Sequence, residues 1–224
     1  MKRPFIIGIG GTCSNAGKTT TAVLLLRYLT SAGSLQQTTG RGGEGTDKAL
    51  SASTGPNTAG PRKWGAVKYS KTGLYSSIVD DKEALSGKDK DTGRFIEAGA
   101  EEVLWVKSPP GELADNLLLA LEKLSYLDGI IVEGNSAIEF LKPDIVIFIF
   151  GNDKERWKPG IERLAGISDI IVYDNESELF EVAKTKRLFF GDRAGIKEVR
   201  GFLELIADLI YERKTERRND EKGC

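Results

Sequence analysis

Short apolar runs alternate with longer, more polar stretches along most of the chain. The apolar runs predict strands, the most apolar of them buried on both faces, and cover residues 5–9, 64–69, 102–106, 129–132, 144–150 and 169–173. The stretches between them predict helices, two with clear apolar stripes at three-and-four spacing, and cover residues 18–30, 91–100, 111–124, 161–165 and 196–213. Strands separated by helices imply right-handed crossovers. We therefore expect a three-layer α/β fold with a mostly parallel sheet and helices on both faces.

Two segments break this pattern. Residues 33–63 hold seven glycines, two prolines and no aromatic residue, so they bury too little apolar surface to offset their ordering entropy and predict a mobile loop. Residues 214–224 belong to a mixed charge run, which predicts a solvated, frayed tail. Because the composition is even elsewhere, we expect residues 1–213 to form a single domain.

The composition excludes several kinds of chemistry. The chain has no histidine, which excludes a histidine base and therefore a Ser-His-Asp triad. Its two cysteines, Cys13 and Cys224, cannot close a structural zinc site or a disulfide framework, and they favour a reducing, cytoplasmic compartment. Chemistry must therefore come from lysines, arginines, carboxylates, hydroxyls and backbone amides.

Net charge and hydropathy limit the partners. The chain has 32 basic and 33 acidic residues and a net charge of −1, which argues against nucleic-acid binding. The apolar run after Lys2-Arg3-Pro4 is only five residues long. That is too short for a signal-peptide core or a membrane span, so we expect no membrane partner.

The clearest motif lies between the first predicted strand and the first predicted helix. It reads Gly11-Thr12-Cys13-Ser14-Asn15-Ala16-Gly17-Lys18-Thr19-Thr20. Small residues let successive backbone amides curl around a phosphate, and the amino terminus of the following helix adds a positive dipole. The motif therefore predicts a P-loop that binds a nucleoside triphosphate. The alternative is a glycine-rich turn that binds nothing.

Three residues at the end of this motif have distinct expected roles. Lys18 can reach the β and γ phosphates and support catalysis, the Thr19 hydroxyl can bind Mg²⁺, and Thr20 can hold the α phosphate. Cys13 is either a small loop residue or a redox-active thiol. The spacing departs from the common loop because five residues, rather than four, separate Gly11 from Gly17.

A second candidate lies at the end of the predicted strand 129–132, where the chain reads Glu133-Gly134-Asn135-Ser136. The carboxyl ends of parallel strands form the crevice in which such sheets bind ligands. Glu133 can therefore bind Mg²⁺, directly or through water, or orient an attacking nucleophile. Otherwise it is a capping or surface carboxylate.

Several stretches resemble known families. The longer loop resembles that of dethiobiotin synthetases and cobyric acid synthases, within the SIMIBI class of P-loop proteins. The middle of the chain resembles molybdopterin-guanine dinucleotide biosynthesis protein B. That resemblance rests on Gly65-Ala66-Val67-Lys68, on Lys90-Asp91-Thr92-Gly93-Arg94-Phe95-Ile96-Glu97-Ala98-Gly99-Ala100 and on Val132-Glu133-Gly134.

The resemblance implies further site residues. By this resemblance, the nucleotide or substrate cleft would be lined by Lys68, Asp91 and Arg94. If the resemblance is set aside, these residues are a surface lysine and two polar residues at the start of a helix. GTP-binding relatives read guanine with an Asn-Lys-x-Asp stretch that is absent here. Asn152 or Asp174 is the candidate for base contact, and the choice between ATP and GTP stays open. Class membership also implies a homodimer.

Three functions remain in view. The first is Mg²⁺-dependent binding and slow hydrolysis of ATP or GTP by an accessory protein, with a molybdenum-cofactor biosynthesis protein or a molybdoenzyme as partner. The second is an ATP-dependent ligase that phosphorylates a small carboxylic acid, as in dethiobiotin synthetases. The third is a nucleotide-dependent switch without significant turnover.

Overall fold

The computed structural model describes residues 3–31, 62–87, 89–175, 179–192 and 194–222. Within them, nine strands form one sheet in the order β3-β4-β2-β5-β1-β6-β7-β8-β9. The strands are β1 (Phe5–Gly11), β2 (Trp64–Lys71), β3 (Ser77–Val79), β4 (Val103–Ser108), β5 (Gly129–Glu133), β6 (Ile145–Ile149), β7 (Ile170–Tyr173), β8 (Arg187–Asp192) and β9 (Gly195–Ile196). All neighbours pair in parallel except β3 with β4 and β9 with β8 at the two edges.

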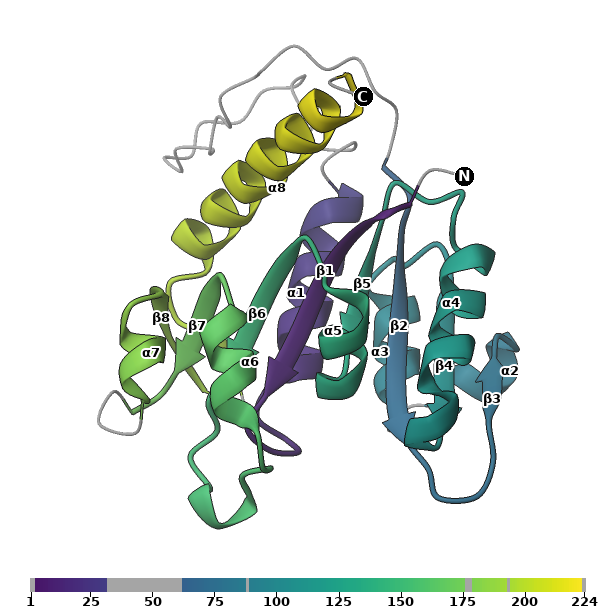
Figure 1. The fold of residues 1–224 in the computed structure, drawn as a ribbon, viewed down its shortest axis with the longest axis horizontal. Coiled ribbons are helices and arrows are strands. Elements are labelled where there is room, and N and C mark those ends of the chain that lie inside the picture. Colours follow the sequence, from purple (N-terminus) through teal and green to yellow (C-terminus); the bar gives the residue numbers. More distant parts are fainter. Residues whose placement is uncertain (1–2, 32–61, 88, 176–178, 193, 223–224) are drawn as a thin grey trace, which may run out of the picture.

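Helices cover both faces of the sheet (Figure 1). They are α1 (Lys18–Ser31), α2 (Lys82–Leu85), α3 (Asp91–Glu97), α4 (Leu113–Lys123), α5 (Asn135–Leu141), α6 (Ile161–Ile167), α7 (Glu181–Lys184) and α8 (Val199–Lys222), with short 3₁₀ turns η1 (Pro110–Glu112) and η2 (Lys154–Arg156). Helices α1, α3 and α8 share one apolar cluster with the sheet, whereas α4 to α7 pack into two clusters on the opposite face. The predicted three-layer α/β fold with a mostly parallel sheet is confirmed.

The central strands are apolar because both of their faces are covered. All seven residues of β1 and all five of β5 and of β6 are buried. Ile7 and Ile9 face the cluster that contains α1, whereas Ile6 faces the cluster that contains α4. Side chains alternate across a strand, so a strand between two helical layers is apolar on both faces, and Glu133 at the end of β5 is the exception in these three strands.

Several boundaries differ from the sequence prediction, and the ends of two helices are the most informative. The predicted helix 91–100 ends at Glu97, and Gly99 adopts a left-handed φ of +91°, which favours glycine just after a helix. The last helix continues to Lys222 rather than ending at Arg213. The sequence predicts a frayed tail from residue 214, whereas the structure has helix over the described residues 214–222. The predicted mobile loop 33–63 lies outside the described residues, apart from residues 62 and 63.

The end of α8 is helical because it is tied to the amino-terminal ends of two strands. Arg213 contacts Asp169 at 3.0 Å and Arg217 forms an ion pair with Asp144. The other carboxylate oxygen of each aspartate accepts a backbone N–H: Ile6 donates to Asp144 at 2.7 Å and Val146 donates to Asp169 at 2.8 Å. These contacts join the charged end of the helix to the sheet. No helix among the described residues is long and apolar enough to cross a membrane.

Candidate functional site

The strand β1 delivers the glycine-rich motif to the carboxyl edge of the sheet, and α1 begins directly after it. Asn15 and Gly17 adopt positive φ angles of +62° and +103°. Such angles suit glycine and, less often, asparagine, and they let the backbone curl. Ser14 and Asn15 are exposed, whereas Thr12, Cys13 and Ala16 are buried beneath the loop. The loop is thus anchored on its inner side and open on its outer side.

Three hydrogen bonds, one of them buried, hold the start of the loop. The Asn135 side chain, at the beginning of α5, accepts from the Gly11 N–H and donates to the Gly11 carbonyl, both at 3.0 Å. On the other side, the Thr12 hydroxyl accepts from the Gly151 N–H at 2.9 Å. A fixed start to the loop allows the exposed amides that follow to keep one orientation.

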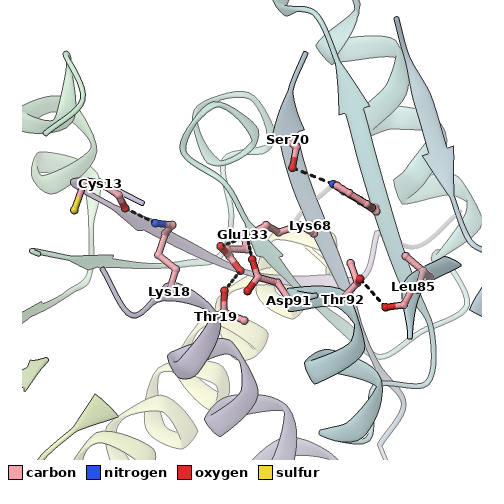
Figure 2. Close-up of polar contacts among 10 residues, drawn as sticks. Cys13, Lys18, Thr19, Lys68, Ser70, Leu85, Asp91, Thr92 and Glu133 are labelled. Carbon is pink, nitrogen blue, oxygen red and sulfur yellow. Dashed lines mark hydrogen bonds and ion pairs between the residues drawn. The ribbon is translucent and has the colours of Figure 1, made fainter. Parts of the chain in front are cut away.

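The Lys18 side chain folds back across the loop (Figure 2). Its Nζ atom donates to the Cys13 carbonyl at 2.6 Å. Burial lowers the pKa of Lys18, an effect that the charge of Glu133 opposes and that the charges of Lys158 and Lys68 reinforce. An ammonium has three N–H donors, so two remain for an anion. The negative charge of a bound phosphate would favour the charged form of Lys18 and so oppose the effect of burial.

Thr19 and Lys68 converge on Glu133 (Figure 2). The Thr19 hydroxyl donates to Oε2 of Glu133 at 2.9 Å, and Lys68 donates to Oε1 at 2.5 Å. The sheet register explains the second contact, because Glu133 pairs with Ile9 on one side and Lys68 on the other. Glu133 is 2% exposed, so its carboxyl group bonds to Thr19 and Lys68 rather than to water.

Lys68 also contacts Asp91, the first residue of α3, at 2.6 Å. Burial opposes charge on both groups, yet their mutual attraction prevails. The charges of Glu133 and Asp91 raise the pKa of Lys68 above its ordinary value, and Lys68 lowers the pKa of Asp91. Both groups are therefore ionised at neutral pH, and the charged Lys68 lies between the carboxyl groups of Asp91 and Glu133.

These residues line a cleft of about 700 Å³. Of the residues predicted from the sequence, the lining includes Ser14, Asn15, Gly17, Lys18, Thr19, Thr20, Lys68, Asp91, Arg94 and Glu133. Gly11, Thr12, Cys13 and Ala16 lie in the buried part of the loop. Asn152, exposed after β6, and Asp174, half-buried after β7, are not among the lining residues. A base contact by Asn152 or Asp174 stays a prediction.

The lining also contains residues that the sequence did not single out as candidates, namely Tyr69, Ser70, Lys71, Gly134, Asn135 and Lys158. Gly134 and Asn135 directly follow Glu133, so proximity along the chain was a usable signal. Lys158 had no such signal, because it is far from the motif in sequence. A second pocket of about 300 Å³ adjoins the cleft and shares Thr20 and Arg94 with it.

Two oxygen-bearing side chains beside the amino terminus of α1 are of the kind that binds Mg²⁺. The Thr19 hydroxyl and the Glu133 carboxylate are hard oxygen donors 2.9 Å apart beside the cleft, and Mg²⁺ prefers oxygen ligands. Among the described residues, no group of three or more histidine, cysteine, aspartate or glutamate side chains forms a metal site. These residues fit an ion that keeps several waters and takes further oxygens from a bound phosphate, as Mg²⁺ usually does.

No protein-family model matches the chain, and neither does any curated protein. Solved structures with a similar fold include LpxK from Aquifex aeolicus in complex with ATP (16% identity, TM-score 0.43), which spans 85% of this chain and is itself covered to 56%. Chloroplast FtsY from Physcomitrella patens (12% identity, TM-score 0.44) matches 91% of this chain and 65% of its own chain. The LAO/AO transport system kinase (14% identity, TM-score 0.46) matches 99% of this chain and 68% of its own chain. The chain thus corresponds to less than two thirds of LpxK and FtsY. At these TM-scores, the likenesses carry no inference about the site.

Proposed function

We propose that the chain binds a nucleoside triphosphate with Mg²⁺ in the cleft and transfers its terminal phosphoryl group to water. The observation that carries this proposal is the phosphate loop itself. Two left-handed residues open the backbone of the loop, and a partly dehydrated Lys18 lies across it with N–H donors to spare. This combination of amides, helix amino terminus and ammonium is suited to an oligophosphate.

The chain's own residues then have separate tasks. The loop amides and Lys18 bind the β and γ phosphates and neutralise charge that develops during transfer. Thr19 and Glu133 would hold Mg²⁺, which supplies Lewis-acid neutralisation of phosphate charge when bound. Lys68 holds Glu133 on the side away from Thr19, at 2.5 Å from Oε1, so Oε2 keeps one orientation. Asp91 fixes Lys68 in turn.

The nucleoside has a candidate place as well. Thr20 is the residue expected at the α phosphate, and it belongs to both the cleft and the second pocket. The second pocket has apolar side chains from α1, β9 and the start of α8, including Val23, Leu24, Ile196 and Val199. We place the nucleoside there, because an apolar floor next to the α phosphate suits a ribose and base.

The biological role rests on sequence resemblance alone. The stretch Lys90–Ala100 and Val132-Glu133-Gly134 resemble molybdopterin-guanine dinucleotide biosynthesis protein B. We therefore propose an accessory role for molybdenum-cofactor proteins, acting as a homodimer. Isolation of the chain with a molybdoenzyme or a cofactor-biosynthesis protein would support this role. Turnover that depends on a small carboxylic acid would support the ligase alternative instead.

A direct test of nucleotide binding is calorimetric titration with ATP, GTP and their non-hydrolysable analogues in the presence of Mg²⁺. Lys18→Ala should weaken triphosphate binding by about 10-fold or more, because charge-assisted hydrogen bonds are worth about 1.5–3 kcal/mol each. The variant should remain folded, because Lys18 is only half-buried and burial disfavours its charge, as the direction of its pKa shift indicates. Removing this charge therefore relieves a cost of burial. Equal affinity in wild type and variant would contradict the proposal, and the titration also decides between ATP and GTP.

A further inference from the structure

A lysine far from the phosphate loop in sequence is held against that loop by the fold. Lys158 follows η2, and its backbone N–H donates to the Thr12 carbonyl at 2.8 Å. The Thr12 hydroxyl accepts from the Gly151 N–H at 2.9 Å. Thr12 is fully buried and thus binds both ends of the segment 151–158. This segment is fastened to the first residues of the phosphate loop.

Aromatic packing fixes the same segment from behind. The Trp157 indole N–H donates to the Gly151 carbonyl at 2.8 Å, closing the segment on itself. The Trp157 ring also meets Phe150 and Phe180 edge to face, at centroid distances of 5.6 and 5.7 Å. Such ring pairs add stability beyond the area they bury. The backbone of Lys158 therefore has a defined position, although its side chain is exposed.

Lys158 lines the cleft together with Lys18 and Thr19. Its charge is felt there, because it contributes to lowering the pKa of Lys18 after the larger effect of burial. Lys68, in contrast, is paired with two carboxylates. Lys158 forms no ion pair with any of the residues that the structure describes. It adds an uncompensated positive charge to the wall of the cleft.

The position along the loop indicates which phosphate this charge would meet. Thr12 is the first residue after β1, whereas Thr20, the residue expected at the α phosphate, lies in the first turn of α1. Lys158 is tied to Thr12 and so lies at the end of the loop opposite Thr20. An oligophosphate that places its α phosphate at Thr20 directs its terminal phosphate toward Lys158.

We propose that Lys158 binds the terminal phosphate of the nucleoside triphosphate and thereby selects triphosphates over diphosphates. This inference rests on the proposed nucleotide binding. A triphosphate carries one more phosphoryl group than a diphosphate, and that group is the one within reach of Lys158. Lys158 is then a phosphate-binding residue supplied by the loop after β6, in addition to Lys18 from the motif.

Calorimetric titration of the full chain with a non-hydrolysable triphosphate analogue and with the diphosphate of the same base, both with Mg²⁺, tests the proposal. Lys158→Ala should weaken binding of the analogue by about 10-fold, as for one charge-assisted hydrogen bond. Binding of the diphosphate should change by less than about 2-fold, and Lys158→Arg should keep the wild-type preference. Lys154→Ala is the matched control, because Lys154 is on the same segment but does not line the cleft, and it should leave both affinities unchanged.

The outcomes separate the two proposals. If wild type binds the analogue and Lys18→Ala does not, but Lys158→Ala binds like wild type, the role of Lys158 is overturned and the nucleotide site stands. Equal weakening of triphosphate and diphosphate by Lys158→Ala also overturns it. If wild type binds no nucleotide, both proposals fail. Melting temperatures of all variants, expected to match wild type, exclude unfolding as the cause.

Discussion

The Thr19 hydroxyl donates to Oε2 of Glu133 at 2.9 Å, although the two residues are 114 positions apart in the sequence. Thr19 is in the first turn of α1 and Glu133 ends β5. Adjacent parallel strands bring both to the carboxyl edge of the sheet, where open α/β proteins bind ligands. This contact joins the end of the glycine-rich loop to the acidic side of the cleft.

Glu133→Gln tests the importance of that carboxylate. The amide keeps the shape but loses the negative charge, so we expect nucleotide turnover to fall by about 100-fold or more, as for other preorganised charged groups. Nucleotide affinity without Mg²⁺ should change little. Steady-state phosphate release measures turnover, and calorimetry with and without Mg²⁺ measures binding. Glu139→Gln, at an exposed position of α5, is the control; unchanged turnover in Glu133→Gln would remove Glu133 from the mechanism.

The Lys68–Asp91 pair predicts an acid dependence of stability. Lys68 lowers the pKa of Asp91 below its ordinary value of 3.8. A lowered carboxyl pKa in the folded state adds stability that is complete above the unfolded value and is lost as the pH falls through the folded one. Asp91→Asn should therefore unfold with a free energy that depends less on pH below about 4 than that of wild type.

Urea unfolding between pH 3 and pH 7 measures this difference. Asp89→Asn, which alters a nearby exposed carboxylate, should retain the wild-type pH dependence. The effect is moderated by solvent, because the Asp91 side chain is 40% exposed and exposed ion pairs are screened. Identical curves for wild type and Asp91→Asn would show that the pair adds no stability.

The two left-handed residues of the phosphate loop should respond differently to substitution. Gly17→Ala forces a Cβ onto a residue with a φ of +103°, so we expect a loss of about 1–3 kcal/mol in unfolding free energy and weaker nucleotide binding. Asn15→Gly should change stability by less than about 1 kcal/mol, because glycine accepts a φ of +62° without strain. Thermal unfolding and nucleotide titration of both variants check this. A Gly17→Ala protein as stable as wild type would mean that the loop adopts another conformation.

The end of α8 provides a test of its docking to the sheet. Arg217→Ala removes the ion pair with Asp144, a carboxylate whose side chain is only 11% exposed. We expect a loss of about 1–2 kcal/mol in unfolding free energy, measured by urea denaturation. Arg218→Ala, at the exposed neighbouring position, should have no comparable effect. Equal stability of the two variants would indicate a solvated tail, as the charge run alone predicts.

The sequence by itself determined the first strand, the glycine-rich loop after it and the first helix, because these depend on local signals. Residues 5–9 are apolar in a row, the loop is rich in small residues, and α1 has its apolar stripe. It also indicated most of the strands and helices, because the central elements are buried and burial constrains composition. Weak strands at the edges of the sheet or beside them were missed, namely β3, β8 and β9, because short or partly exposed strands carry little apolar periodicity.

Only the tertiary structure decided which polar residues meet. Lys68 touches Glu133 because β2 lies beside β5 in a particular register, and the order of parallel strands depends on crossovers that the sequence does not encode locally. Lys158 reaches the phosphate loop through hydrogen bonds to a buried threonine, and α8 extends to Lys222 because distant aspartates pair with its arginines. Long-range contacts decide which charged side chains meet, whereas short-range patterns decide where strands and helices form.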